Sequence, residues 1–272
     1  MGYKRILSVQ DISCVGKCST TVALPILSAF GHEVCILPTA VLSTHTGMKT
    51  KPEVHHMDKA IPSFRDHWAR EGVRFDIILT GYLGNIGAID EVLKIADTLL
   101  SPGGLLIVDP AMADHGRLYS GLSEAYAAAM SRLCSRADIV LPNITEAAML
   151  AGMAYGDLTE EYVSDLLRNL PYERVVLTGA GHVPDETGAE IYDGGLRSSF
   201  RHRRFPGNYH GTGDMFAACV AGAIASGKDL QTAAKIAGDF TAMAIECTVD
   251  DPDGCYGVKF EPCLWRLHEM MK

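Results

Sequence analysis

Apolar and polar positions alternate along the chain with two different periods, and this alternation predicts the secondary structure. Short runs rich in aliphatic and β-branched residues predict strands, and stretches with helical spacing of their apolar residues predict helices. The predicted strands are 5–9, 33–39, 75–81, 105–110, 138–142, 174–179, 189–194 and 199–205. The predicted helices are 20–30, 86–100, 121–135, 159–170 and 212–226. Strands and helices therefore succeed one another along most of the chain.

This succession is typical of an α/β fold with a parallel sheet covered by helices on both faces. The runs 75–81, 105–110 and 138–142 are almost continuously apolar, as expected of strands buried on both sides. We expect a central, mostly parallel sheet between two helical layers, forming a single domain over residues 1–272. The polar stretch 43–62 contains two prolines and is expected to be a loop or flap.

Composition and charge exclude several classes of protein. Of 272 residues, 47% are hydrophobic and 21% are charged, and the net charge is -9, which argues against a nucleic-acid partner. No run approaches the roughly 18 apolar residues of a membrane span, and the N-terminal apolar run is too short for a signal peptide. The eight cysteines form no CxxC pair and the histidines no HExxH motif. We expect reduced thiols and a cytoplasmic location.

Polar residues occur where several predicted strands end. Tyr82, Asp109, Asn143 and Thr178 each lie at or just beyond the end of a strand, and Glu146 follows Asn143 by three residues. Ligands of open parallel sheets bind at the carboxyl ends of the strands. The sequence therefore predicts a ligand site along this edge.

The segment HGTGDMFAACVAGAI, residues 210–224, joins a glycine-rich turn to an apolar helix. Such a turn presents free backbone N–H groups and the positive end of the helix dipole to an anion. Asp214 in this turn could accept a proton from an attacking hydroxyl, and the dipole is expected to keep it ionised. The combination favours phosphoryl transfer to an alcohol. Alternatively, Thr212 or Asp214 simply caps the helix.

Other phosphate-binding and nucleophile motifs fail at particular residues. Gly16-Lys17 suggests a Walker A motif, but Asp11 and Cys18 stand where that motif requires glycine and Ser or Thr. The spacing of GYLGNIG (81–87) does not fit GxGxxG, and no GxSxG motif is present.

Further motifs accompany the GTGD turn in a consistent order over nearly the whole chain. They are Gln10, LSTHTG (42–47), LTGYLG (79–84), VDPAMAD (108–114), LPNITEAAML (141–150) and LTG (177–179). With these motifs the chain resembles the pyridoxal/pyridoxamine kinase branch of the ribokinase superfamily. The resemblance implies a ribokinase-like three-layer sandwich and ATP- and Mg²⁺-dependent phosphorylation of the 5'-hydroxymethyl group of a B6 vitamer, in salvage of pyridoxal 5'-phosphate. It also implies a homodimer.

The resemblance assigns roles to the matching residues. Asp214 would be the catalytic base, and Gly211, Thr212 and Gly213 the anion hole. Contacts with the substrate ring are implied for Asp11, Ser43, His45, Thr46 and Tyr82. Contacts with ATP phosphates are implied for Thr178, Asp109, Asp114 and Asn143. Mg²⁺ would be held, largely through water, by Glu146, Asp109 and Asn143.

Structural roles stay open for several of these residues. Asn143 and Glu146 could form a capping box, Asp109 could be a turn aspartate, and Tyr82 could be ordinary packing. Asp11 could cap a helix beginning near Lys17 or bind a backbone amide in its own turn. Many family members have serine in place of Asp11. If this carboxylate faces the substrate, it favours the cationic amine of pyridoxamine.

Two other functions also stay open. Hydroxymethylpyrimidine kinases share the implied fold and act on a molecule of similar size with a similarly placed amine. A non-catalytic B6-binding regulatory protein on the same scaffold is the alternative from a different class.

Overall fold

The computed structural model describes residues 2–251 and 256–271, and its centre is a nine-stranded sheet. The strands are β1 (Arg5–Ser13), β2 (Glu33–Leu42), β3 (Val54–His56), β4 (Phe75–Thr80), β5 (Leu100–Val108), β8 (Ile139–Val140), β9 (Arg174–Thr178), β10 (Glu186–Asp193) and β11 (Leu196–Arg203). A separate small hairpin consists of β6 (Ala113–Asp114) and β7 (Arg117–Leu118). The helices are α1 (Thr20–Ala29), α2 (Ile61–Arg70), α3 (Ile86–Leu99), α4 (Glu124–Cys134), α5 (Ile144–Leu150), α6 (Glu160–Asn169), α7 (Thr212–Ala225), α8 (Leu230–Glu246) and α9 (Leu264–Met270).

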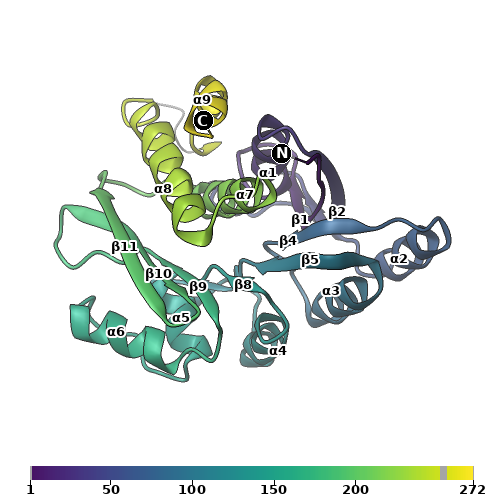
Figure 1. Ribbon diagram of the computed structural model, residues 1–272, viewed down its shortest axis with the longest axis horizontal. Helices are drawn as coiled ribbons and strands as arrows, with labels where there is room; N and C mark the ends of the chain where they lie inside the picture. Colours follow the sequence, from purple (N-terminus) through teal and green to yellow (C-terminus); the bar gives the residue numbers. More distant parts are fainter. Residues whose placement is uncertain (1, 252–255, 272) are drawn as a thin grey trace.

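The sheet has the order β11-β10-β9-β8-β5-β4-β1-β2-β3 (Figure 1). The stretch from β9 through β2 is parallel throughout. Antiparallel strands occur only at the two edges of the described sheet: β3 pairs with β2, and the β10–β11 hairpin pairs with β9. The expectation of a central, mostly parallel sheet is confirmed.

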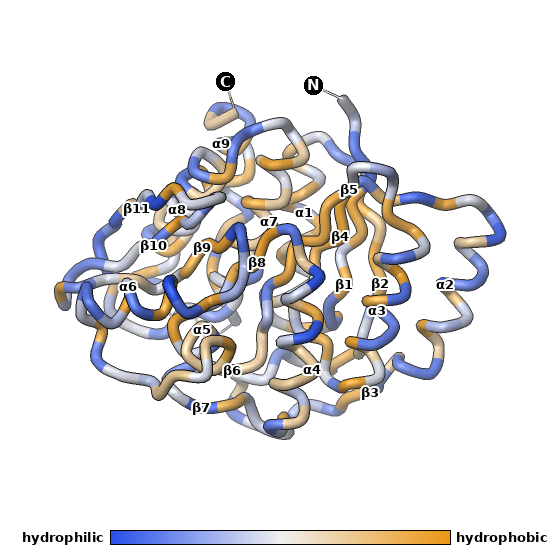
Figure 2. The backbone as a smooth tube through the Cα atoms, turned by 60° about the horizontal axis from the view of Figure 1, so that its bottom comes forward, coloured by the Kyte–Doolittle hydropathy of each residue, from blue (hydrophilic) through white to orange (hydrophobic). Residues whose placement is uncertain are grey.

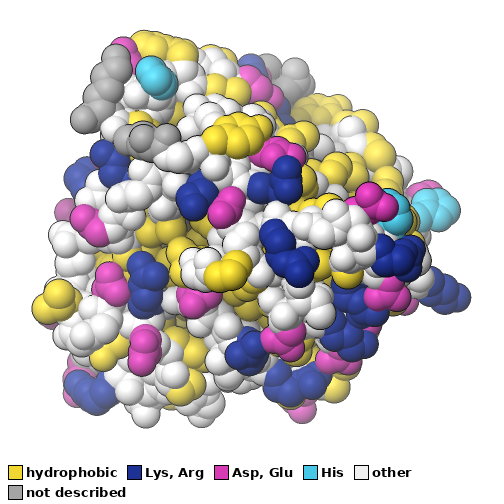
Figure 3. Space-filling view, turned by 45° about the vertical axis from the view of Figure 1, so that its right-hand side comes forward, with side chains coloured by type: hydrophobic (Ala, Val, Ile, Leu, Met, Phe, Trp, Pro, Cys, Tyr) yellow, Lys and Arg dark blue, Asp and Glu magenta, His cyan; other side chains and the backbone are white. Residues whose placement is uncertain are grey.

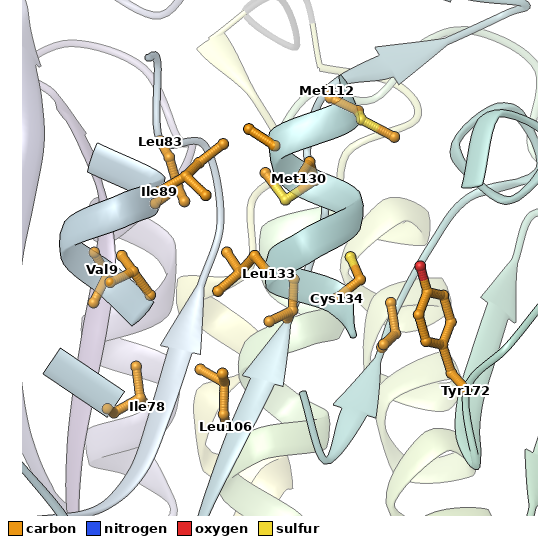
Figure 4. Close-up of a cluster of buried hydrophobic side chains, with 14 of the residues drawn as sticks. Val9, Ile78, Leu83, Ile89, Leu106, Met112, Met130, Leu133, Cys134 and Tyr172 are labelled. Atoms are coloured by element: carbon orange, nitrogen blue, oxygen red, sulfur yellow. The ribbon is translucent and has the colours of Figure 1, made fainter. Parts of the chain in front are cut away.

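Helices cover both faces of the sheet because successive strand residues point to opposite sides. Ile6 and Ile77 pack with α1, α7, α8 and α9, whereas Leu7 and Ile78 pack with α3, α4, α5 and α6. Figure 2 shows that hydrophobic residues predominate along the central strands. Figure 4 shows Ile78 and Leu106 in the same buried cluster as Leu133 of α4. The predicted three-layer sandwich is confirmed.

Every predicted strand and helix is present, with differences at the ends. β1 extends to Ser13, so Asp11 lies within the strand rather than after it. The stretch 43–62 is only partly a loop, because it contains β3 and its last residues begin α2. β3 is a short edge strand whose three residues are all exposed, so a pattern based on burial did not reveal it.

The surface of the protein carries charges of both signs. On the face shown in Figure 3, Lys and Arg side chains are interspersed with Asp and Glu. In the described part of the chain, no helix combines the length and the apolar character that crossing a membrane requires.

Candidate active site

The carboxyl ends of the central strands bring the predicted polar residues to one edge of the sheet. The N–H of Asp109 donates to the carbonyl of Thr80 (3.3 Å), and that of Thr178 donates to the carbonyl of Pro142 (2.9 Å). Asn143 and Thr178 form a parallel bridge just beyond their strands. Residues from four separate segments of the sequence therefore lie side by side, as expected.

The turn that starts α7 leaves its first backbone N–H groups without helical partners. Gly211 is the N-cap, with a φ of 81°, and a Cβ there would collide with the carbonyl oxygen of Lys17. The first N–H of the helical ladder is that of Met215, which donates to the carbonyl of Gly211 (3.0 Å). The N–H groups of Thr212, Gly213 and Asp214 precede it and can face an anion.

Neither Thr212 nor Asp214 caps α7, so the capping alternative for this turn is wrong. No side chain caps this helix, and the Thr212 hydroxyl donates to the carbonyl of Tyr209 (3.0 Å). One carboxylate oxygen of Asp214 accepts a hydrogen bond from the backbone N–H of Ser19 (2.8 Å). Asp214 is thus held by another part of the chain.

The environment of Asp214 raises its pKa to about 7, mainly through burial of the carboxyl group. The charges of Asp109 and Asp11 raise the pKa further, and the Ser19 N–H opposes the shift. The expectation that Asp214 is kept ionised is therefore wrong below about pH 7, because desolvation of the buried carboxyl group favours its neutral form. A carboxyl with a pKa near 7 suits general-base chemistry at neutral pH.

Asn143 and Glu146 form a complete capping box at the start of α5. The Asn143 side chain accepts from the N–H of Glu146 (3.0 Å), and Glu146 Oε2 accepts from the N–H of Asn143 (2.9 Å). Glu146 Oε1 also accepts from the N–H of Met112 (2.9 Å), and Glu146 is only 2% exposed. The structural alternative is confirmed for this pair, which also ties α5 to the turn after β5.

Asp109 lies on that turn and Asp114 lies in the short strand β6 that follows, and their surroundings differ. Asp109 accepts from the N–H of Ala111 (3.1 Å) in its own turn, and burial together with the charge of Glu146 raises its pKa. Asp114 is exposed, and its carboxylate accepts from the N–H of His115 (2.7 Å). Asp109 is therefore a turn aspartate, as the structural alternative proposed, and is also one of a group of neighbouring carboxylates.

This group of carboxylates fits a cation that is bound mostly by other ligands. Within 2–251 and 256–271, no three His, Cys, Asp or Glu side chains are arranged to hold a metal ion. Mg²⁺ commonly binds through one or two carboxylates, with phosphate oxygens and water as the other ligands. Asp109 fits this requirement, whereas both oxygens of Glu146 already accept from backbone N–H groups.

The residues implied for the substrate ring differ in exposure. Ser43 bonds Glu53 in both directions, through its N–H and its hydroxyl (3.0 Å each), and so closes the loop between them. Thr46 is exposed, and Tyr82 is half-buried, with a pKa raised by burial and by the charge of Asp11. His45 is 2% exposed, and its ring lies 4.9 Å from that of His210.

Asp11 is 4% exposed and both of its oxygens accept from serine hydroxyls. Ser19 Oγ donates to Oδ1 (2.5 Å) and Ser13 Oγ to Oδ2 (3.2 Å). Burial raises the pKa of Asp11, and both serines oppose the shift. Asp11 does not cap a helix near Lys17, since α1 begins at Thr20 with Ser19 as its N-cap and has no capping side-chain hydrogen bond.

Two further residues lie at this site without having been predicted. Ser19 contacts Asp11 and Asp214, and Tyr119 has a pKa raised by burial and then by Glu146, Asp109, Asp114 and Asp214. Tyr119 follows the VDPAMAD motif closely, which is a weak signal. Ser19 lies in a segment that the sequence marks only by its failed Walker A pattern.

Comparison with known proteins gives a kinase family and several similar kinases. The phosphomethylpyrimidine kinase family matches residues 27–258. A crystal structure of pyridoxal kinase from Lactobacillus plantarum is 34% identical, with a TM-score of 0.90, covering 99% of this chain and 98% of that one. A candidate phosphomethylpyrimidine kinase from Bacteroides thetaiotaomicron, in a crystal form with pyridoxal, is 30% identical, with a TM-score of 0.92, covering 100% and 96%.

A curated relative has a related activity. The hydroxymethylpyrimidine/phosphomethylpyrimidine kinase of Haemophilus influenzae is 32% identical over 64% of this chain and 68% of its own length. The family matches most of the chain, and the sheet, the glycine turn and the grouped carboxylates agree with a kinase. This protein is a kinase that belongs to the phosphomethylpyrimidine kinase family.

Proposed function

We propose that this protein transfers the γ-phosphoryl group of ATP, with Mg²⁺, to the 5'-hydroxymethyl group of a B6 vitamer. The observation that carries the proposal is the start of α7. There the Asp214 carboxylate does not cap its own helix, and the N–H groups of Thr212 and Gly213, which have no partner within the helix, lie directly before it. Phosphoryl transfer to an alcohol needs a base for the hydroxyl and donors for the charge on the phosphoryl group.

Asp214 would act on the acceptor hydroxyl directly. Its carboxylate takes the hydroxyl proton as the substrate oxygen forms a bond to the γ-phosphorus, while the bond from that phosphorus to the β–γ bridging oxygen breaks and ADP leaves. The N–H groups of Thr212 and Gly213 would stabilise the negative charge of the phosphoryl oxygens. Gly213 supports this arrangement, since no protein atom lies within 4 Å of a Cβ added there.

Asp109 would hold the metal, with Asn143 and Glu146 acting mainly through the turn they fix. Bound Mg²⁺ would supply charge neutralisation between the phosphate oxygens. Asp114 and Thr178 would contact phosphates or their hydration shell. The Thr178 hydroxyl lies near the carbonyl of Pro142 (3.4 Å), a long contact that leaves it free to turn toward a ligand.

A B6 vitamer is the preferred acceptor because of both sequence and relatives. Ser43, Thr46 and Tyr82 belong to the motifs that resemble the B6 branch, and His45 fixes the same loop against His210. The similar Lactobacillus plantarum protein is a pyridoxal kinase, and the Bacteroides thetaiotaomicron structure was solved with pyridoxal. Hydroxymethylpyrimidine is the second candidate, favoured by the matching family and the Haemophilus influenzae relative.

The test is ATP consumption with a panel of acceptors: pyridoxal, pyridoxamine, pyridoxine, hydroxymethylpyrimidine, ribose and adenosine. The proposal predicts the highest kcat/KM for one of the three vitamers. A higher value for hydroxymethylpyrimidine would establish the second candidate. Vitamer binding without ATP consumption would instead indicate a non-catalytic B6-binding protein.

We further propose that the protein acts in the cytoplasm as a homodimer. All the cysteines that the structure describes are free thiols, which agrees with a reducing compartment. Light scattering coupled to size-exclusion chromatography tests the dimer, since a mass near that of one 29.3 kDa chain would contradict it.

A further inference from the structure

Ser19 has a backbone conformation that L-residues rarely adopt. Its φ is 52° and its ψ is -128°. Among the described residues, only Ser19 and His115 combine a side chain with a positive φ. Such strain persists when surrounding contacts impose it, and it is concentrated at functional sites. Ser19 is also the N-cap of α1, yet its side chain makes no capping hydrogen bond.

The contacts of Ser19 explain this conformation. Its N–H donates to Asp214 Oδ2 (2.8 Å), and its hydroxyl donates to Asp11 Oδ1 (2.5 Å). Its carbonyl accepts from the N–H groups of Val22 (3.0 Å) and Ala23 (2.9 Å), as an N-cap carbonyl does. The Ser19 hydroxyl therefore donates to Asp11 and does not cap the helix. This contact holds the backbone of Ser19 so that its N–H points toward Asp214.

Asp11, which accepts from the Ser19 hydroxyl, is itself held in place by the sheet and by Ser13. It lies within β1, where the register with β2 shifts between Gln10 and Ile12, and bulges of this kind redirect a side chain. Ser13 holds its second oxygen (3.2 Å), and the residue is 4% exposed. A bridge between Ile12 and Ser19 joins the strand to the loop directly beside the hydroxyl contact.

We propose that Asp11 and Ser19 are positioning residues, which hold the carboxylate of Asp214 in the orientation that receives the acceptor proton. Neither residue touches the reacting atoms in this proposal, which rests on the proposed kinase function. The sheet fixes Asp11, Asp11 fixes the Ser19 hydroxyl, and the Ser19 N–H fixes one oxygen of Asp214. The other oxygen of Asp214 remains for the substrate.

The principal variant is Ser19→Gly, which relieves the strained φ and keeps the backbone N–H but removes the hydroxyl. Misplacement of a catalytic group by about 1 Å can cost about 100-fold in rate. We expect kcat to fall roughly 10- to 100-fold while KM for both substrates changes little. The pH of half-maximal kcat should also rise, since the N–H that favours ionised Asp214 is no longer directed at it. Ser123→Gly at the N-cap of α4 is the matched control.

Variants of Asp11 test whether the two residues act as one unit. Asp11→Ala should lower kcat as Ser19→Gly does, and Asp11→Asn should recover much of the loss. Asparagine can accept from Ser19, while the Ser13 hydroxyl rotates to accept from the amide. The double variant Asp11→Ala/Ser19→Gly should be no slower than the slower single variant. Melting temperatures of all variants identify any loss that comes from unfolding.

The outcomes separate this proposal from the function on which it rests. Wild-type protein that phosphorylates none of the panel would overturn the proposed function. An active wild type with unchanged kcat and pH profile in folded Ser19→Gly would overturn the positioning role. Asp11→Asn that alters the pyridoxamine-to-pyridoxal ratio of kcat/KM roughly tenfold, the size of a charge-assisted hydrogen bond, would also overturn it. Asp11 would then be a substrate contact, as the family resemblance implies.

Discussion

Two helices of this protein carry an acidic residue at the same position of the first turn and use it in opposite ways. α5 begins after Asn143 and carries Glu146 at its third position, and α7 begins after Gly211 and carries Asp214 at its third position. Glu146 bonds back to the N-cap of its own helix (2.9 Å). Asp214 bonds instead to Ser19, 195 residues away in the sequence (2.8 Å).

The N-cap residue accounts for the difference. Asparagine has a side chain that caps the helix and pairs with the carboxylate at the third position, so the first turn of α5 is internally satisfied. Glycine has no side chain to offer, and the first N–H groups of α7 stay available. The same acidic position is thus structural in one helix and available for chemistry in the other.

The largest expected effect comes from Asp214→Asn. If Asp214 is the base, kcat should fall about 10²- to 10⁴-fold, the usual contribution of general acid–base catalysis. Binding of ATP, measured by calorimetry, should change little. A variant that keeps near-normal kcat would show that Asp214 is not the base, so that the acidic residue of α7 would have no more catalytic role than that of α5.

The same variant should gain relative stability as the pH rises. Burial raises the pKa of Asp214 from 3.8 to about 7, so folding favours the protonated form. The stability that this preference contributes is fully present below the unfolded pKa and is lost as the pH rises through about 7. Asparagine carries no such charge. The melting temperature of the variant minus that of wild type should therefore increase from about pH 5 to about pH 8.

A pair of glycine variants separates the structural and ligand-facing parts of the α7 turn. Gly211→Ala should destabilise the fold strongly, because alanine at a positive φ is strained and its Cβ meets the Lys17 carbonyl. Gly213→Ala should keep or improve stability, by up to about 1 kcal/mol, because its Cβ meets no protein atom. Its kcat should nevertheless fall if phosphate approaches this turn closely. Unchanged kcat in Gly213→Ala would place the phosphate elsewhere.

Glu146→Gln should mainly affect stability, by about 1–3 kcal/mol. Glutamine serves an isolated capping box, but both oxygens of Glu146 accept from backbone N–H groups. In glutamine one of these oxygens becomes an NH₂ group, which would face a backbone N–H and could not accept from it. Chemical denaturation measures the loss. Thr159→Ala, which removes an ordinary N-cap from α6, is the control and should cost about 1 kcal/mol. A silent Glu146→Gln would show that the second contact, to Met112, contributes nothing.

The smallest effect is expected for Asp109→Asn at moderate Mg²⁺ concentration. Removing this carboxylate should raise the Mg²⁺ concentration needed for half-maximal rate severalfold, with a smaller loss at saturating Mg²⁺. The variant should not be less stable, since the buried charge beside Glu146 is gone. An unchanged Mg²⁺ titration would assign the metal to other groups.

The sequence predicted the parts of this protein that depend on local pattern. Continuous apolar runs located the central strands, and the polar residues that follow them, such as Asp109 and Asn143, do meet at one edge of the sheet. The short exposed strand β3 escaped because neither of its faces is buried. The capping box at Asn143 was visible as a spacing, although spacing alone could not decide between cap and metal site.

The contacts of Asp214 and Asp11 could not be predicted, because they depend on where distant segments meet. Ser19 approaches Asp214 only after α1 and α7 pack together, and nothing in either local sequence indicates a hydrogen bond between them. The raised pKa of Asp214 follows from the same packing, since its first cause is burial. Helix-dipole reasoning considers only the residue's own helix and therefore does not include this desolvation.

The measurement that tests the role of Asp214 most directly is the pH dependence of kcat/KM for pyridoxal, because this ratio reports the ionisation of the enzyme before the acceptor binds. If Asp214 is the base and must be ionised, kcat/KM should be level above about pH 7 and fall about tenfold for each pH unit below it. The residual activity of Asp214→Asn should lack this dependence. A wild-type kcat/KM that stays constant from about pH 5.5 to about pH 8 would contradict the assignment of Asp214 as the base.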